Sequence, residues 1–300
     1  MHRLNLFRFL FCAFAAFAVA LSASAQTQAG AVKAARVTGE VLKLSKDGTT
    51  ASVKDGSLLT ETDTVITRGS ATVVLVFANG SSISLAENSR LAIEEFKMDP
   101  LAGDINVAKL SNEPSVSKTR LNLAYGEMVG NVKKLNAASS YDVTTPVGAA
   151  GIRGTTFRIV LRFDAQGKAS FSLATSEGLV NFTASGTVQV TSGTGEAAVP
   201  AGTEVTATVT VDPTSGAITN IAVSTPSTIS STAAAAITSA VTTAVEATAT
   251  VTITQTEQNN PQQQQQQQNQ QNQQNQQNQQ NQQNQNQETI GKDTSVISPG

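Results

Sequence analysis

The sequence has 300 residues, a formal net charge of -2 and 14% charged residues, with one histidine, one cysteine and no tryptophan. It contains no run of basic residues, so it lacks the electrostatic footprint of proteins that bind nucleic acids or anionic membranes. We therefore expect no nucleic-acid partner.

Residues 1–25 have the three parts of a secretory signal peptide. Two arginines precede an apolar run from Phe9 to Leu21, and Ala23-Ser24-Ala25 supplies an Ala-x-Ala cleavage site. The run is shorter than the roughly 20 apolar residues that a membrane span needs. We expect cleavage after Ala25 and a mature chain without a transmembrane segment. The protein would then lie in the periplasm, at the surface or outside a bacterial cell.

Cleavage also changes the chemistry that is available, because His2 and Cys12 both lie in the signal peptide. The mature chain would have neither a thiol nucleophile nor a histidine base, and no disulfide or zinc site of the usual histidine or cysteine kind. We therefore expect no enzyme activity, no cofactor and no metal.

After a flexible lead-in at 26–34, residues 35–163 read as a domain of short β-strands. The strands are separated by turn residues, and Asn79-Gly80 is the strongest hairpin signal among them. Thr155 to Phe163 alternates, with Phe157, Ile159 and Leu161 on one face and Arg158 and Arg162 on the other. This pattern predicts an all-β fold.

The rest of the chain changes in composition. Residues 164–225 keep the same turn spacing and are expected to extend the β-body. Residues 226–257 are Ala- and Thr-rich and form either a helix or a linker. A helix there could begin at Pro226-Ser227-Thr228 and dock on the β-domain or pair with another copy. Residues 258–300 are a Gln/Asn-rich tail, expected to be disordered and to self-associate through side-chain amides. In the helix alternative for 226–257, apolar residues recur every four positions and are expected to form its buried face: Ile229, Ala233, Ile237, Val241 and Val245.

The stretch from Val143 to Ile159 combines a proline, three spaced glycines and an arginine. Gly148-x-x-Gly151-x-x-Gly154 superficially resembles a phosphate-binding loop. Such a loop needs a helix after it and usually a lysine, whereas a β-type run follows here. The glycines are better explained by tight turns and close packing.

Arg153 lies between Ile152 and Gly154, and we expect its side chain to turn inward. It would then bind neighbouring carbonyls or a carboxylate such as Asp142 or Glu127, in a structural role rather than in ligand binding.

Two acidic pairs are weak candidates for chemistry. Glu94 and Glu95 are neighbours in a strand and face opposite ways, which is unsuited to acid–base work. Glu61 and Asp63 share a face and could hold a cation, but solvated acids beside a turn are the more ordinary interpretation.

Several motifs occur in the order and approximate spacing of the FecR domain, which this sequence resembles from roughly Arg36 to Leu161. The motifs are Gly39-Glu40-Val41, Asp63 to Ala71, Asn79-Gly80-Ser81, Leu123 to Glu127, Thr145-Pro146 and Ile152 to Phe157. The motif positions, expected to be structural, are Thr145, Pro146, Gly151, Arg153, Gly154, Thr155, Phe157, Asn79, Gly80 and Gly126.

The resemblance implies a periplasmic all-β domain of β-solenoid or rolled character. In well-known members the domain relays occupancy of an outer-membrane siderophore receptor to a cytoplasmic sigma factor. Those sensors have a cytoplasmic helical portion and a membrane span before the domain. Here a signal peptide precedes it directly, which is typical of a free-standing exported domain that binds or scaffolds.

Three functions follow from the sequence. The first is a non-catalytic module that binds a protein or glycan of the cell envelope. The second is a structural surface or matrix protein that assembles through its tail. The third is a soluble component of siderophore-type signalling with a separate membrane partner.

Overall fold

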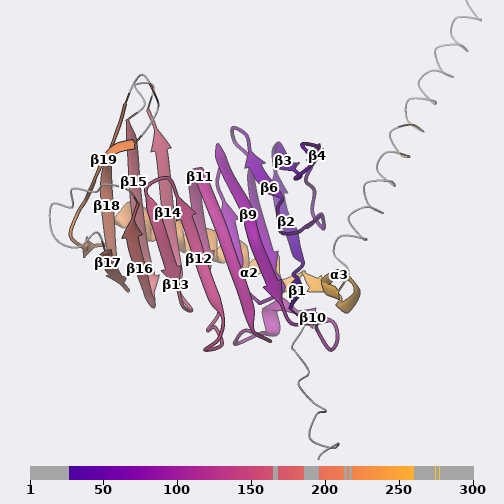
Figure 1. The fold of residues 1–300 in the computed structure, drawn as a ribbon. Coiled ribbons are helices and arrows are strands. Elements are labelled where there is room, and N and C mark those ends of the chain that lie inside the picture. The colour runs from indigo at the N-terminus through magenta and orange to yellow at the C-terminus, as the bar shows by residue number, and fades with distance from the viewer. Residues whose placement is uncertain are drawn as a thin grey trace, which may run out of the picture.

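The computed structural model describes residues 27–164, 168–185, 196–212 and 218–259, together with Ser215, Gln274 and Gln277. The predicted signal peptide and nearly all of the Gln/Asn-rich tail lie outside the described residues. Within them the fold is built mostly of β-strands in two layers, with one long helix late in the chain (Figure 1). The all-β prediction is confirmed.

Sheet A is the layer that faces the viewer in Figure 1. A short strand, β1 (Gln28–Ala29), also pairs with the C-terminal end of β9 in this sheet. In spatial order sheet A contains β4 (Thr50–Ser52), β3 (Val41–Leu44), β6 (Thr64–Thr67), β9 (Ser89–Met98), the first half of β11 (Ser117–Asn131), β12 (Ser140–Thr145), β13 (Gly148–Ile152), β16 (Leu179–Ala184) and β17 (Glu196–Pro200).

Sheet B lies behind sheet A. A short strand, β20 (Ser227–Thr228), pairs with β18 at the end of this sheet. In spatial order sheet B contains β5 (Leu58–Leu59), β2 (Val32–Thr38), β7 (Thr72–Phe77), β8 (Ser82–Leu85), the second half of β11, β14 (Thr156–Phe163), β15 (Ala169–Glu177), β18 (Thr203–Val211) and β19 (Ile218–Val223).

Strand β11 joins the two sheets because it belongs to both. Its residues up to Tyr125 pair with β9 in sheet A, and its residues from Gly126 onward pair with β14 in sheet B. Through this crossing the strands form one closed, barrel-like body. Among the described strand pairs only β11–β12 is parallel. The pattern is that of a rolled antiparallel sheet, and the solenoid form of the prediction is not confirmed.

The inner faces of the two sheets pack into one apolar core. Phe77 and Phe96 meet edge to face with ring centroids 5.1 Å apart, and Phe171 and Phe182 stack at 5.0 Å. Strand β14 buries Phe157, Ile159 and Leu161 completely, as its alternating sequence predicts. Residues beyond Phe163 share this core, because β15 pairs with β14 and β18 pairs with β15.

Helix α2 (Ser231–Ala249) crosses the outer face of sheet B, behind the strands in Figure 1. The helix alternative for this segment is confirmed. It begins later than Pro226, because Ser227 and Thr228 form β20 and the Ser230 side chain accepts the bond from the Ala233 amide at 3.3 Å.

The side chains that α2 buries differ in part from the predicted stripe. Ala233 and Ile237 pack on Val129 and Ala174 of sheet B, but Val245 is 59% exposed. A spacing of four residues advances 400° on a helix of 3.6 residues per turn, so the stripe drifts by about 40° at each step. Ala244 and Ala247 therefore take the buried positions near the C-terminal end.

The first described strand, β1, and the end of the continuous described segment at Asn259 lie at the same end of the body. After α2, β21 (Thr252–Ile253) pairs with β10 (Ile105–Asn106), which precedes the short helix η1 (Val107–Lys109), and α3 (Gln255–Asn259) lies against β1. Gln258 accepts a bond from the Ala31 amide at 2.7 Å and Glu257 pairs with Lys33 at 2.8 Å. Within the described residues, no helix is both long and apolar enough to cross a bilayer.

Candidate functional site

The turn between β7 and β8, which contains Asn79 and Gly80, is hydrogen-bonded to a neighbouring strand. The Asn79 side chain is buried, donates to the hydroxyls of Ser117 at 3.1 Å and Thr119 at 3.3 Å, and accepts from the Ser81 hydroxyl at 2.7 Å. These bonds tie the turn to the start of β11. Gly80 has a φ of +91°, which suits glycine.

Gly126 lies where β11 crosses between the sheets. Its φ is +107°, and a Cβ placed there would overlap Ser89, including the Ser89 backbone. The next residue, Glu127, donates its amide to the Ser89 hydroxyl at 3.0 Å. A glycine is thus required both by the backbone conformation and by the close approach of the two strands.

The second group of motif residues lies around β13 and the start of β14. The Thr145 hydroxyl accepts from the amides of Val147 and Gly148, both at 3.1 Å, and so closes the turn that contains exposed Pro146. Gly154 has a φ of +68°, and a Cβ there would press on Lys134. Thr155 and Phe157 are buried, whereas an added Cβ at Gly151 would have ordinary space. The motif residues are thus distributed over several turns and the core.

The expected inward orientation of Arg153 is wrong. Arg153 is exposed at the bend after β13, and within the described part of the chain it makes no ion pair. One of its expected partners is occupied, because Glu127 binds Arg158 and Arg162 instead. At a bend the guanidinium reaches water without any desolvation cost, so it needs no buried acceptor.

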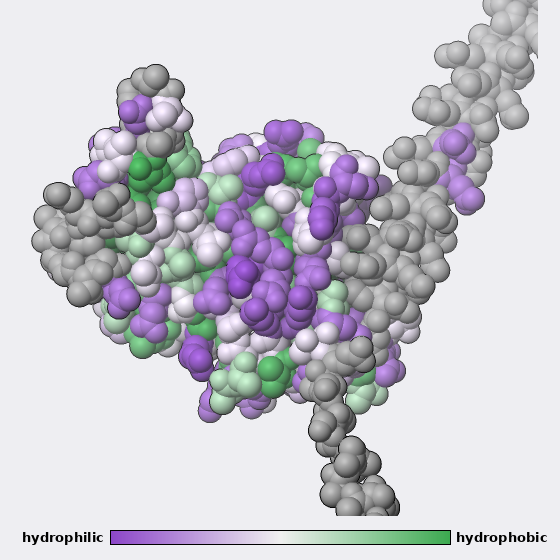
Figure 2. All heavy atoms as spheres, viewed as in Figure 1, coloured by the Kyte–Doolittle hydropathy of each residue, from purple (hydrophilic) through white to green (hydrophobic). Residues whose placement is uncertain are grey.

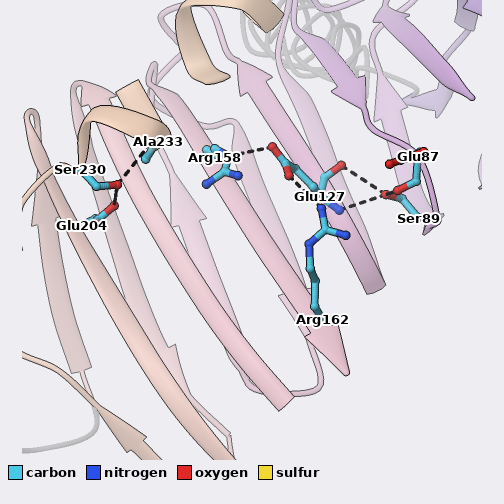
Figure 3. Close-up of polar contacts among 8 residues, drawn as sticks. All are labelled: Glu87, Ser89, Glu127, Arg158, Arg162, Glu204, Ser230 and Ala233. Atoms are coloured by element: carbon cyan, nitrogen blue, oxygen red, sulfur yellow. Dashed lines mark hydrogen bonds and ion pairs between the residues drawn. The ribbon is translucent and has the colours of Figure 1, made fainter. Parts of the chain in front are cut away.

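Glu127 forms an ion-pair cluster on the outer face of sheet B (Figure 3). Its carboxylate accepts from Arg158 Nε at 2.8 Å and from Arg162 at 3.1 Å, and its backbone is held by Ser89, which also bonds to the carbonyl of Glu87. Arg158 and Glu127 are mostly buried and Arg162 is half exposed. Figure 3 also shows Ser230 bridging Glu204 and Ala233 at the start of α2. The Glu127 cluster links β11 to β14, and the Ser230 bonds link the start of α2 to β18.

Two cavities flank α2 and meet at Arg36. One, of about 240 Å³, lies between α2 and the strands β7, β8 and β11, and the other, of about 440 Å³, lies near Lys33, Asp55 and Thr250. Arg36 has a φ of +51° in a bulge of β2, which aims its side chain at Glu246 of α2, 3.0 Å away. Of the charged groups that line these cavities, Arg36 pairs with α2, Lys33 pairs with Glu257 of α3, and Asp55 and Glu127 bond to groups of the strand body.

Two further titratable side chains are buried and do not line either of the two cavities. Burial lowers the pKa of Lys43, and the nearby carboxylates of Asp63 and Asp47 partly oppose this shift. Burial raises the pKa of the Tyr141 hydroxyl. Asp63 is itself buried and accepts from the Thr60 amide at 2.9 Å, while Glu61 is only half-buried. The described residues contain no group of three or more His, Cys, Asp or Glu residues that could hold a metal ion.

The outer face of sheet A carries a second charged cluster, centred on Glu95. Its carboxylate lies 3.1 Å from Lys118, 3.5 Å from Arg120 and 3.7 Å from Lys97. The side chain of Glu95 is 15% exposed, whereas those of the three cations are 42% to 55% exposed. Figure 2 shows hydrophilic residues gathered in the middle of this face. Among the described residues the long helix α2 packs on sheet B and not on this face. The carboxylate is therefore hidden beneath cations that face solvent.

Sequence reasoning missed the Glu95 cluster because no stretch of the chain is rich in basic residues. The cluster depends on the register of β9 and β11, in which Arg120 pairs with Glu95 and Lys118 with Lys97. An alternation of Lys118 and Arg120 with buried Thr119 and Leu121 was the available signal. Glu113 was also missed: its buried carboxylate accepts from the Ser117 and Ser139 hydroxyls and from the Asn136 amide at 2.9 Å.

A family model described as FecR protein matches residues 63–181, which confirms the resemblance over this segment. Two crystal structures of a "putative anti-sigma factor" from Parabacteroides distasonis ATCC 8503, at 1.65 and 2.50 Å resolution, are similar in structure. Their identities to this chain are 10% and 9%, with TM-scores of 0.37 and 0.36. The match covers 58% of this chain and 63% and 62% of theirs, which is less than two thirds of their length. No curated protein matches the chain.

Proposed function

We propose that this chain, which carries a FecR domain at residues 63–181, is a non-catalytic exported module that binds a partner at the cell envelope through the outer face of sheet A. The proposal combines the sequence-based expectation of export with the arrangement of the two sheets. Its partner class is a protein or a glycan.

The observation that carries the proposal is the difference between the two outer faces. Helix α2 covers sheet B, where Val129 and Ala174 are buried beneath Ala233 and Ile237. Within the described residues no helix packs on the outer face of sheet A as α2 does on sheet B, and the middle strands of sheet A present charged and polar side chains (Figure 2). Charged side chains on such an exposed face are available for electrostatic complementarity with a partner, which gives specificity.

A non-catalytic role agrees with the chemistry of the charged groups. Glu127 is engaged by two arginines and Glu95 lies beneath three cations, so neither carboxylate is poised as a free acid or base. The mature chain would also lack histidine and cysteine.

Capture from envelope extract tests the proposal. The mature chain from Gln26 onward would serve as bait beside the variant Lys118→Gln/Arg120→Gln, which loses two exposed cations of sheet A. A matched control, Lys54→Gln/Arg68→Gln, loses two exposed cations in turns. We expect the sheet A variant to lose at least about tenfold in captured partner while the control retains it. Equal capture by both variants would contradict the proposal.

A second function, a platform that assembles through the Gln/Asn tail, is favoured by one observation. Helix α3, which contains the first residues of the tail, is bonded to the chain beside β1, so the tail is attached at one end of the body. Removal of residues 260–300 tests it while keeping Gln258, which binds the Ala31 amide. Loss of assembly with unchanged partner capture supports this second role, and unchanged assembly contradicts it.

A further inference from the structure

We propose that the partner of the sheet A face is an acidic polysaccharide, whose carboxylates bind the cations gathered around Glu95. This inference rests on the proposed function and specifies its partner.

The first argument is electrostatic. Lys97, Lys118 and Arg120 surround one carboxylate, so these four groups have a net charge of +2 on a chain whose net charge is -2, and the charge remains +1 when Asp142, which pairs with Arg120 in register, is included. Glu95 holds the three cationic groups close to one another, and about half of each side chain remains exposed. Arg120 lies two residues from Lys118 on β11, and Lys97 lies opposite Lys118 on β9, so an arginine and two lysines form one cationic patch suited to carboxylate recognition.

The second argument concerns the shape of the surface. Strand register places Glu95, Arg120, Asp142, Gly151 and Asn181 in one row across five strands. Four strand spacings of about 4.8 Å make this row about 19 Å long. Gly151, the fourth residue of the row, adds no side chain between Asp142 and Asn181, and both cavities described above lie near α2 instead. A flat row of this length fits an extended polymer better than a small molecule.

The third argument separates a glycan from a protein. Stable protein interfaces are centred on buried aromatic or apolar anchors. Beside the cations, this face instead presents half-buried or exposed Asp142, Thr144, Asn181 and Thr183. Its large exposed apolar or aromatic residues are Tyr125, at the crossing of β11, and Leu179, at the start of β16. Amide, hydroxyl and carboxylate groups in such a row are suited to bonding with sugar hydroxyls.

Titration with defined polymers tests the inference. The mature full-length chain would be titrated calorimetrically with polygalacturonate, a carboxylate-bearing polysaccharide, and with dextran, an uncharged one. Polyglutamate would provide the same charge on a polypeptide. We expect binding to polygalacturonate that weakens from about 50 to about 500 mM NaCl, at least about tenfold weaker binding to polyglutamate, and none to dextran. Tighter or equal binding to polyglutamate would overturn the glycan assignment, as would no binding to polygalacturonate.

The same variants locate the site. Lys118→Gln/Arg120→Gln should weaken polygalacturonate binding at least about tenfold, whereas Lys54→Gln/Arg68→Gln should change it less than about twofold. Equal weakening in both pairs would mean that the whole surface, and not this cluster, attracts the polymer, and would overturn the inference. If polygalacturonate fails but envelope capture still depends on Lys118 and Arg120, the glycan assignment is wrong and the proposed function stands.

Discussion

Replacing Gly126 by alanine tests the claim that the crossing of β11 determines the fold. Gly126 has a φ of +107°, and an added Cβ would fall well inside the 3.0 Å that real Cβ atoms keep from other atoms. The overlapping atoms include the backbone of Ser89, so rotation of a side chain cannot relieve the contact.

The cost can be assembled from three terms. A non-glycine residue at such a φ costs about 1–2 kcal/mol. Displacing Ser89 weakens its bond from the Glu127 amide, now 3.0 Å long, at a further cost of about 1 kcal/mol. The shift of the neighbouring strand adds about 1–2 kcal/mol of overpacking. Gly126→Ala should therefore lose about 3–5 kcal/mol, a large part of the stability of an ordinary domain.

Urea unfolding followed by far-ultraviolet circular dichroism measures this loss, since the chain has no tryptophan for fluorescence. Gly151→Ala is the matched control, because its added Cβ would lie 3.7 Å from Asp142 and 3.8 Å from Asn181. We expect this control to stay within about 1 kcal/mol of the unaltered protein. A loss below about 1 kcal/mol for Gly126→Ala would refute the reasoning.

Three further variants test other parts of the fold. Asn79→Ala should lose about 2–3 kcal/mol in urea unfolding, because buried hydroxyls at Ser117 and Thr119 lose their donor; a loss below about 0.5 kcal/mol would argue against this network. Arg153→Ala should change stability by less than about 0.5 kcal/mol because the side chain is exposed, and a larger loss would reveal an inward partner. Burial lowers the pKa of Lys43, so the folded state binds fewer protons than the unfolded state just below the ordinary value of 10.5. Stability should rise with pH through that window and do so less in Lys43→Met, whereas identical pH profiles would contradict this.

Much of the fold could be predicted from local patterns. Asn79-Gly80 forms the expected turn, and Phe157, Ile159 and Leu161 enter the core while Arg158 and Arg162 face outward. These features depend on neighbours in sequence, because turn residues and strand alternation act over a few positions.

Features that depend on long-range pairing could not be predicted in this way. Gly126 is a motif position in the sequence, but only the pairing with β9 and β14 shows that β11 belongs to both sheets. Arg153 was assigned an inward side chain because its neighbour Ile152 is apolar, although it lies on a bend. The Glu95 cluster likewise arises from strands separated in sequence, so composition alone conceals it.

The central claim, that the outer face of sheet A binds the partner, is tested most directly by labelling lysines in the presence of envelope extract. Acetylation followed by mass spectrometry would compare Lys97 and Lys118 on that face with Lys46 and Lys54, which are exposed in turns. We expect acetylation of Lys97 and Lys118 to fall at least about threefold on binding, because their ammonium groups would be engaged, while Lys46 and Lys54 react as before. Unchanged acetylation of Lys97 and Lys118 on the partner-bound protein would contradict the account.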